Sequence, residues 1–194
     1  MNIVLATTNP HKLEEVRQMM SPAGVNVLGL DAINFHNDIV EDGSSMTENA
    51  LIKARAVSVT TTLPVIADDS GLEVDVLGGA PGIYTARYAG PKKNSVDNMK
   101  KLLHEMIDAQ NRDAQFRAVV ALIINGQERT FEGVVRGEIL KSMQGTDGFG
   151  YDPIFRPEAY DISFAQMTST TKNKLSHRGL AIQRVLHFLK NKKG

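Results

Sequence analysis

The stretch 116-FRAVVALII-124 constrains the fold more than any other part of the chain, because it is β-branched and almost continuously hydrophobic. A run of this kind is typical of a central strand in a sheet. Asn125-Gly126 follows at once and is the strongest short hairpin signal in the sequence. The stretch 129-RTFEGVVRGEI-139 is then expected to return as the partner strand.

Strand and helix signals alternate along much of the remaining chain. Further strands are expected at residues 3–6, at residues 25–30, and from Pro64 to Asp68 and Asp69. Helices are expected at residues 47–62 with Thr47 as the cap, at residues 95–107, and from about Leu175 to Lys192. The Gly- and Pro-rich residues 77–90 predict a long connection. At 194 residues, the chain is long enough for one large domain or for one domain with two lobes.

A short polar turn, 7-TTNPHK-12, joins the first predicted strand to a helix. Asn9 is suited to the N-cap and Pro10 to the first helical position. A strand, a polar turn and a helix start form a geometry in which backbone N–H groups and the helix dipole can hold an anion. Most such turns only cap their helix, so the turn by itself leaves both interpretations open.

Charge and composition exclude several classes of protein. The 22 Lys and Arg residues balance the 22 Asp and Glu residues, so the formal net charge is zero. General binding to nucleic acid or to a membrane surface usually needs a basic excess, and neither is expected here. The chain has no cysteine, which excludes disulfides, Cys-based zinc sites and thiol nucleophiles. No apolar run approaches the roughly 20 residues of a membrane span, and 3-IVLA-6 is too short for a signal sequence, so a soluble cytoplasmic protein is expected.

Two consecutive aspartates, Asp68 and Asp69, follow a short apolar run. They predict either an acidic turn that caps the strand or a metal site, and the turn is the commoner outcome. Glu41 is a further carboxylate upstream, and Lys53 shares a helical face with Asn49, four residues earlier. Carboxylates of this kind could hold Mg²⁺, which typically takes one or two of them together with phosphate oxygens and waters.

Basic residues near the last predicted helix could hold an anionic ligand; these are Lys172, His177 and Arg178. His177 and Arg178 fall in the first turn of that helix, where the helix dipole disfavours a cation, so an anion opposite them is favoured. Phe149 lies between glycines that would let a ligand come close, and its ring could stack on a base.

Five motifs occur in order along the chain: ATTNPHK, VEDG…ENALIKA, ADDSGLEVDVLGGAPGIYTARYAG, GFGYDPIF and SHRG. In this order they resemble the inosine triphosphate pyrophosphatase family, from residue 2 to about residue 190. The resemblance implies an α/β fold with a long mixed β-sheet, whose flanking helices form two lobes around a nucleotide-binding cleft, usually in a homodimer. It also implies Mg²⁺-dependent hydrolysis of ITP, dITP and XTP, which are purine nucleoside triphosphates, to the monophosphate and pyrophosphate.

The resemblance also assigns roles to residues of this chain. Asp69 matches the acid that serves as general base and metal ligand, with Asp68 supporting it, and Glu41 matches the acidic residue near the metal. The residues matched to substrate binding are Thr7, Thr8, Asn9, Pro10, His11, Lys12, Lys53, Ser70, Phe149, Gly150, Tyr151, Asp152, Lys172, His177 and Arg178. Many family members carry glycine where this chain has Thr8 and His11, so its phosphate contacts are expected to differ there.

Two other classes of function stay open at this point. A nucleotide-binding regulator would hold triphosphates without cleaving them, and loss of the acids would favour it, yet Glu41, Asp68 and Asp69 are all present. A phosphatase on another scaffold is the chemical rival. Release of pyrophosphate, rather than orthophosphate, distinguishes the resemblance from that rival.

Overall fold

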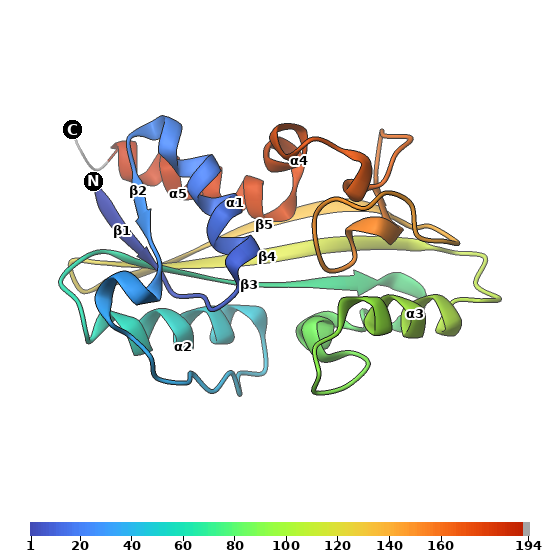
Figure 1. Ribbon diagram of the computed structural model, residues 1–194, viewed down its shortest axis with the longest axis horizontal. Coiled ribbons are helices and arrows are strands. Elements are labelled where there is room, and N and C mark those ends of the chain that lie inside the picture. The colour runs from blue at the N-terminus through green and yellow to red at the C-terminus, as the bar shows by residue number, and fades with distance from the viewer. Residues whose placement is uncertain (192–194) are drawn as a thin grey trace. The chain divides into compact units, whose positions relative to one another are not determined.

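The computed structural model describes residues 1–191, and its sheet has six strands in the order β2-β1-β3-β4-β5-β6 (Figure 1). The strands are β1 (Asn2–Leu5), β2 (Asn26–Leu28), β3 (Val65–Val74), β4 (Asp113–Ile124), β5 (Gln127–Ile139) and β6 (Phe155–Pro157). β1 pairs in parallel with both β2 and β3, whereas β5 and β6 are antiparallel. The predicted mixed sheet is therefore confirmed.

The α-helices within residues 1–191 are α1 (Pro10–Met20), α2 (Met46–Ser58), α3 (Ser95–Glu105), α4 (Ser169–Leu175) and α5 (His177–Asn191). The last predicted helix thus begins at His177 rather than at Leu175, and its predicted end at Lys192 lies outside the described residues. In this part of the chain no helix combines the length and the apolar character needed to cross a membrane.

The described chain divides into two compact units. Unit 1 consists of Met1–Asp69, Ala118–Gly133 and the segment that begins at His177, and unit 2 consists of Ser70–Arg117 and Val134–Ser176. The boundaries fall inside β3, β4 and β5, so each of these strands contributes residues to both units. Each unit has a hydrophobic core of its own.

In unit 1, helices cover both faces of the strands. α1 and α5 lie together on one face, and α2 lies on the other (Figure 1). Ile66 of β3 packs in one cluster with Val16 of α1 and Val185 of α5. Successive residues of a strand point to opposite faces. β3 therefore directs residues 66 and 68 toward α1 and α5, and residues 67 and 69 toward α2.

The core of unit 2 is built around three phenylalanines. The ring of Phe116 meets the ring of Phe155 edge-on, with 4.7 Å between centroids, and lies 6.0 Å from that of Phe164. Leu72 and Val74 of β3 are fully buried in the same cluster. Burial of these two side chains favours continuation of β3 beyond Asp68 and Asp69.

The prediction that this strand ends at Asp68 and Asp69 is wrong, because both lie in the middle of β3. The turn-forming residues 69-DSG-71 are overridden by the burial of Leu72 and Val74 in alternation. The N–H of Leu72 also donates a hydrogen bond to Thr85 Oγ1, which fixes the extended backbone beyond the turn-like sequence.

Two helix predictions also differ from the structure. α2 is capped by Ser45, whose side chain accepts a hydrogen bond from the N–H of Glu48, and not by Thr47; it ends at Ser58 rather than at residue 62. The polar residues 168–175, for which the sequence predicts no helix, contain α4, which is capped by Thr168. The Asn125-Gly126 hairpin is confirmed, with φ of 51° and 71°, as a type I′ turn requires.

Candidate active site

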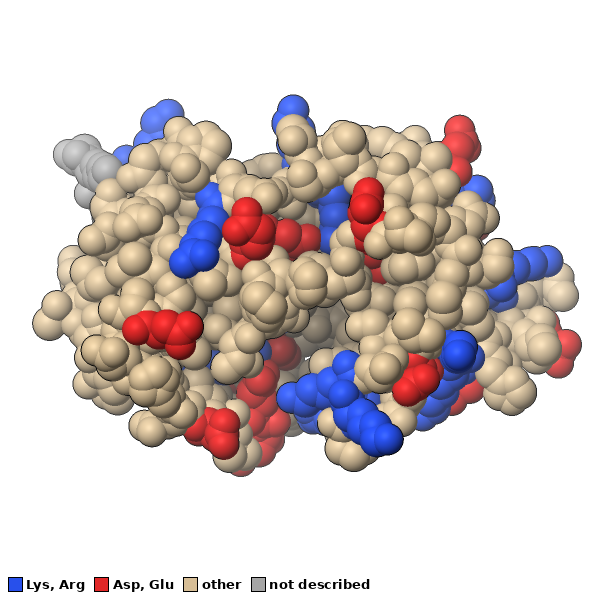
Figure 2. Space-filling view, in the orientation of Figure 1, with Lys and Arg blue, Asp and Glu red and all other residues tan. Residues whose placement is uncertain are grey.

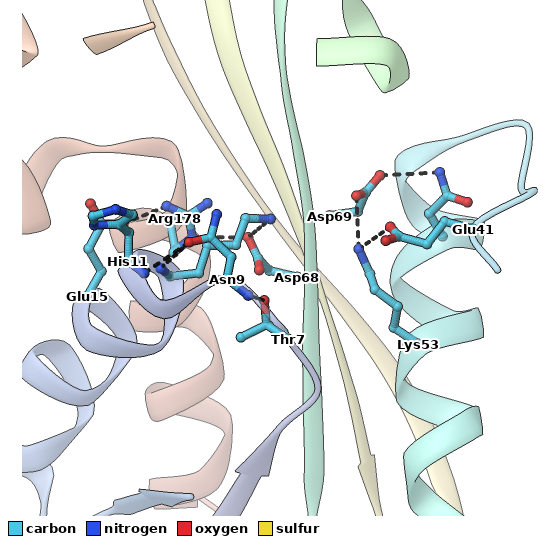
Figure 3. Close-up of polar contacts among 11 residues, drawn as sticks. Thr7, Asn9, His11, Glu15, Glu41, Lys53, Asp68, Asp69 and Arg178 are labelled. Atoms are coloured by element: carbon cyan, nitrogen blue, oxygen red, sulfur yellow. Dashed lines mark hydrogen bonds and ion pairs between the residues drawn. The ribbon is translucent and has the colours of Figure 1, made fainter. Parts of the chain in front are cut away.

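The geometry of the site begins with the alternation of side chains along β3. Asp68 and Asp69 are consecutive in the strand, so their side chains point to opposite faces. Figure 3 shows Asp68 directed toward α1 and Arg178, and Asp69 directed toward Lys53 of α2. The two negative charges are therefore compensated by different groups.

On the α2 side, the ammonium group of Lys53 joins two carboxylates. Its Nζ lies 3.0 Å from Asp69 Oδ1 and 2.5 Å from Glu41 Oε2. Burial lowers the pKa of Lys53, but the charges of Asp69, Asp68 and Glu41 outweigh burial and raise this pKa above its ordinary value. For Asp69, burial is the largest influence and raises the pKa of the carboxyl, against the lowering effect of Lys53 and Lys12. Asp69 is therefore a stronger proton acceptor than an ordinary aspartate.

On the opposite side, Asp68 lies in a buried series of ion pairs. Arg178 Nε donates to Asp68 Oδ2 over 3.0 Å, and Arg178 Nη1 donates to Glu15 Oε2 over 2.6 Å. Lys12 Nζ lies 3.2 Å from the same oxygen of Asp68. Burial alone would raise the pKa of Asp68, but the positive charges of Lys12, Arg178 and Lys53 together hold it well below its usual range. Such a carboxylate is a poor proton acceptor.

The turn before α1 is organised by Asn9, which is the predicted N-cap. Asn9 Oδ1 accepts hydrogen bonds from the N–H groups of His11 and Lys12, and Thr7 Oγ1 accepts one from the N–H of Asn9. These three backbone donors already have partners within the chain. Side chains of the turn, such as the Lys12 ammonium and the exposed Thr8 hydroxyl, are therefore better placed than these N–H groups to meet a phosphate.

A second group of predicted substrate-binding residues lies in unit 2 and is held together by Asp152. Asp152 Oδ2 accepts hydrogen bonds from the N–H of Phe149 over 2.8 Å and from Lys172 Nζ over 2.6 Å. Asp152 and Lys172 are both buried. Lys172 Nζ also lies 4.8 Å from the centroid of the Phe149 ring, within the range of a cation–π interaction. Asp152 and Lys172 thus fix the backbone and the ring of Phe149.

The remaining predicted residues occupy varied environments. Tyr151 is 2% exposed and its hydroxyl donates to the carbonyl oxygen of Thr85, so it anchors its loop. Gly150 has a φ of 66°, which glycine adopts most readily. Ser70 follows Asp69 on β3, and His177 is buried at the first position of α5. Pro10 and His11 are exposed on the first turn of α1.

The donors on the α2 side fit a divalent cation. Glu41 and Asp69 both approach one positive group, the Lys53 ammonium, so their oxygens already converge. Within residues 1–191 there is no cluster of three or more His, Cys, Asp or Glu side chains suited to a metal. This pair nevertheless suits Mg²⁺, which typically takes one or two carboxylates and completes its shell with substrate oxygens and waters. Glu41 and Asp69 are the residues that would hold the ion.

Two residues of these contact networks were not among the predicted site residues. Glu15 lies three residues after Lys12 on α1 and binds Arg178. Asn49 lies four residues before Lys53 on α2 and contacts Asp69. Helical spacing puts each of them on the same face as a predicted site lysine. In the sequence this spacing already puts Asn49 on the helical face of Lys53, and the same spacing from Lys12 would have identified Glu15.

The fold and the site define an α/β protein that carries buried, paired charges on both faces of one strand, an arrangement suited to an anionic ligand and a divalent cation. A family model described as the Ham1 family matches residues 3–188. The chain belongs to the Ham1 family.

Similar proteins cover the chain almost completely. A protein named dITP/XTP pyrophosphatase from Flavobacterium psychrophilum is 44% identical over 98% of this chain and 100% of its own length. Another of that name, from Bacillus licheniformis, is 46% identical over 96% of this chain and 97% of its own. The structure of the Staphylococcus aureus Ham1 protein matches with a TM-score of 0.88 at 38% identity, over 99% of this chain and 100% of that one. The family resemblance inferred from the motifs is confirmed.

Proposed function

We propose that the protein hydrolyses dITP, ITP and XTP to the corresponding monophosphate and pyrophosphate, with Mg²⁺ as its cofactor, and so removes non-standard purines from the nucleotide pool. The observation that carries this proposal is the convergence of Glu41 and Asp69 on Lys53. It occurs in a chain whose relatives over nearly its full length are named dITP/XTP pyrophosphatases.

Asp69 accepts the proton of the attacking water in this proposal. Burial raises the pKa of its carboxyl, which strengthens the carboxylate as a base, while Lys53 holds one of its oxygens at 3.0 Å. The chemistry that Mg²⁺ supplies when bound is neutralisation of phosphate charge and acidification of a water molecule. Asp68, whose pKa is lowered, stays ionised and holds Lys12 and Arg178.

The leaving pyrophosphate needs positive groups that stabilise its developing charge. Lys12 and Lys53 are the proposed partners of the pyrophosphate. The side chain of Lys12 is 16% exposed, so it is accessible while it remains 3.2 Å from Asp68.

Purine recognition is proposed to depend on donors to the 6-keto oxygen, supplied by Lys172, His177 and Arg178, with Phe149 stacking on the ring. The amino group of adenine would leave such donors unpaired, and sites of this kind can discriminate by about 10⁴ or more. Guanine also has a 6-keto group, so rejection of GTP requires a further contact at position 2 of the purine.

Pyrophosphate release from dITP, ITP, XTP, GTP and ATP in the presence of Mg²⁺ tests this function. We expect fast release from the first three nucleotides and slow release from ATP, with one monophosphate formed per pyrophosphate. Orthophosphate as the direct product would contradict the proposed reaction. Tight binding of dITP without cleavage would instead support a nucleotide-binding regulator.

Asp69→Asn is the variant that tests the base. We expect turnover of dITP to fall by on the order of 100-fold or more, the typical contribution of a general base, while the circular dichroism spectrum keeps its wild-type shape. Near-normal turnover in this variant would remove Asp69 from the mechanism.

The family resemblance also supports two proposals about the protein in the cell. We propose that it is a homodimer and that it acts in the cytoplasm, where nucleoside triphosphates are used. Light scattering during size-exclusion chromatography should then give twice the chain mass of 21.2 kDa. A mass equal to that of one chain at micromolar concentration would contradict the dimer.

A further inference from the structure

Asn49 links two parts of the site on the α2 side. It is 3% exposed, and its Oδ1 accepts a hydrogen bond from the N–H of Gly43 over 2.9 Å. Its Nδ2 donates to Asp69 Oδ2 over a longer distance of 3.4 Å. Gly43 follows Glu41 by two residues. One side-chain amide therefore connects the segment that carries Glu41 to the carboxylate of Asp69.

Asn49 and Lys53 approach these groups from successive turns of α2, because residues four apart lie on one helix face. Lys53 holds Oδ1 of Asp69, and Asn49 faces Oδ2 of the same carboxylate. Lys53 also holds the side chain of Glu41, and Asn49 holds the backbone of Gly43. The helix thus fixes both carboxylate-bearing segments at two points each.

The chemistry of the contacts fixes the orientation of the Asn49 amide. If the amide were reversed, its carbonyl oxygen would face Asp69 Oδ2 and its NH₂ group would face the N–H of Gly43, which places like partners together. The segment also approaches α2 closely. A Cβ atom at position 43 would lie 2.7 Å from Asn49 Oδ1 and 2.8 Å from the Cβ of Glu48. Only glycine allows this approach without displacement of the segment.

We propose that Asn49 is a positioning residue for the divalent cation: it sets the Glu41 segment against Asp69, so that both carboxylates reach the ion in one geometry. In this role Asn49 acts through Asp69 and Gly43 rather than by touching the substrate. The inference rests on the proposed function for its effect on turnover, but its effect on metal binding can be measured separately. Residues that orient metal ligands typically contribute about 10–100-fold to metal affinity, and about tenfold is expected for Asn49.

Three variants separate this role from a general structural one. Asn49→Leu removes both hydrogen bonds at similar side-chain size. Gly43→Ala displaces the segment from the other side of the contact and leaves Asn49 intact. Asn98→Leu is the matched control, because Asn98 is also 3% exposed and lies on a helix. It holds a loop of unit 2 by accepting from the N–H of Ala89 over 2.6 Å.

The primary measurement is binding of Mn²⁺ to the nucleotide-free protein, followed by loss of the free-ion signal in electron paramagnetic resonance. We expect Asn49→Leu and Gly43→Ala each to weaken Mn²⁺ affinity by about tenfold. Because both act on one contact, the double variant should bind Mn²⁺ no more weakly than the weaker single variant. Asn98→Leu should lower the midpoint of thermal unfolding and keep the wild-type Mn²⁺ affinity.

The second measurement is the Mg²⁺ concentration that gives half-maximal pyrophosphate release from dITP. It should rise by about tenfold in Asn49→Leu and in Gly43→Ala, whereas the KM for dITP at saturating Mg²⁺ stays near the wild-type value. A fall in kcat that no Mg²⁺ concentration restores, at unchanged Mn²⁺ affinity, would overturn the positioning role.

Wild-type Mn²⁺ affinity in Asn49→Leu would also overturn the proposal. The same holds if Asn98→Leu loses as much Mn²⁺ affinity as Asn49→Leu, or if the wild-type protein binds no Mn²⁺. If Asn49→Leu does not fold, Gly43→Ala decides by the same results. Failure of the proposed function gives a different pattern. A wild-type protein that releases no pyrophosphate from any of the five nucleotides refutes that function, and the Mn²⁺ affinities still decide the role of Asn49.

Discussion

At the level of single residues, the geometry of β3 separates two adjacent negative charges. Alternation along the strand directs Asp68 to Lys12 and Arg178, and it directs Asp69 to Lys53. The two environments move the pKa values of the carboxyls in opposite directions, lower for Asp68 and higher for Asp69. Divergent pKa values are what distinguish a permanently charged carboxylate from a proton acceptor. Asp68 therefore has a structural role, and Asp69 has the proposed catalytic role.

Asp68→Asn tests the structural role. The substitution removes the carboxylate that the buried Arg178 shares with the partly exposed Lys12, and leaves Arg178 with Glu15 alone. Breaking a buried ion pair typically costs about 3–5 kcal/mol of unfolding free energy. Urea unfolding at neutral pH measures the difference between variant and wild type.

The pH dependence of this difference has a definite sign. The pKa of Asp68 is lower in the folded than in the unfolded protein, so its contribution is present above the unfolded value of about 4 and is lost as the pH falls toward the folded value. The stability difference between wild type and Asp68→Asn should therefore shrink below a pH of about 4. A difference that is the same at neutral and at acidic pH would contradict the assigned ion pairs.

The sequence predicted Asp69, Glu41 and Lys53 as site residues, because each lies in a motif of the family. It did not predict that Asp68 and Asp69 face opposite sides, because the turn propensity of 69-DSG-71 suggested a strand end. The partner that keeps Asp68 buried in the strand, Arg178, is 110 residues away in the chain. A local pattern holds no information about a contact of that range.

Phe149→Ala tests the predicted stacking on the purine. Stacking of a base on an aromatic ring is worth about 1–3 kcal/mol, so the KM for dITP should rise by about fivefold or more while kcat changes little. Phe131→Ala is a suitable control, because Phe131 packs partly buried against the core of unit 1 and should affect stability alone. Equal KM values for Phe149→Ala and wild type would exclude stacking.

At the level of elements, the first turn of α5 packs closely against Gly133 of β5. A Cβ atom at Gly133 would lie 2.0 Å from the carbonyl oxygen of His177 and 2.6 Å from the nitrogen of Ala181. Both are backbone atoms of α5, so no rotamer change can relieve the clash. This close approach sets the helical turn from which Arg178 reaches Asp68.

Gly133→Ala should therefore move the first turn of α5 and weaken the contact between Arg178 and Asp68. Overpacking of this kind typically costs about 1–3 kcal/mol of unfolding free energy, and we expect a loss of dITP turnover with it. Gly24→Ala is the control: its Cβ would meet nothing within 4 Å, but its φ of 70° strains alanine, so stability should fall and turnover should not. Wild-type stability in Gly133→Ala would contradict the packing described.

Elements with a strong local signal could be predicted, and those that depend on tertiary contacts could not. The β4–β5 hairpin follows from a β-branched run and from the Asn125-Gly126 turn, both of which are local. α4 has no apolar stripe in its sequence, and the structure shows other support: a Thr168 cap and the buried pair of Lys172 with Asp152. A helix that is polar all round gives no periodic signal.

At the level of the whole molecule, the basic residues of the site are paired with acidic residues, and the chain has no overall excess of basic residues. The chain carries 22 basic and 22 acidic residues, and both signs occur on the face shown in Figure 2. The site cations Lys12, Lys53 and Arg178 are each paired with at least one acid. A small anion can meet these cations individually, whereas a nucleic acid needs a basic surface that neutralises many phosphates.

The balance of charge leads to a prediction about ligand choice. The protein should bind a nucleoside triphosphate but not duplex or single-stranded DNA, because no excess of positive charge is available to release counterions from the polymer. Fluorescence anisotropy with labelled DNA at about 150 mM salt, near physiological ionic strength, should show no saturable binding. Calorimetric titration of Asp69→Asn with dITP supplies the positive control, because this variant should bind the nucleotide without consuming it. Micromolar DNA affinity that falls steeply as salt is added would show a basic surface that the balanced charges do not predict.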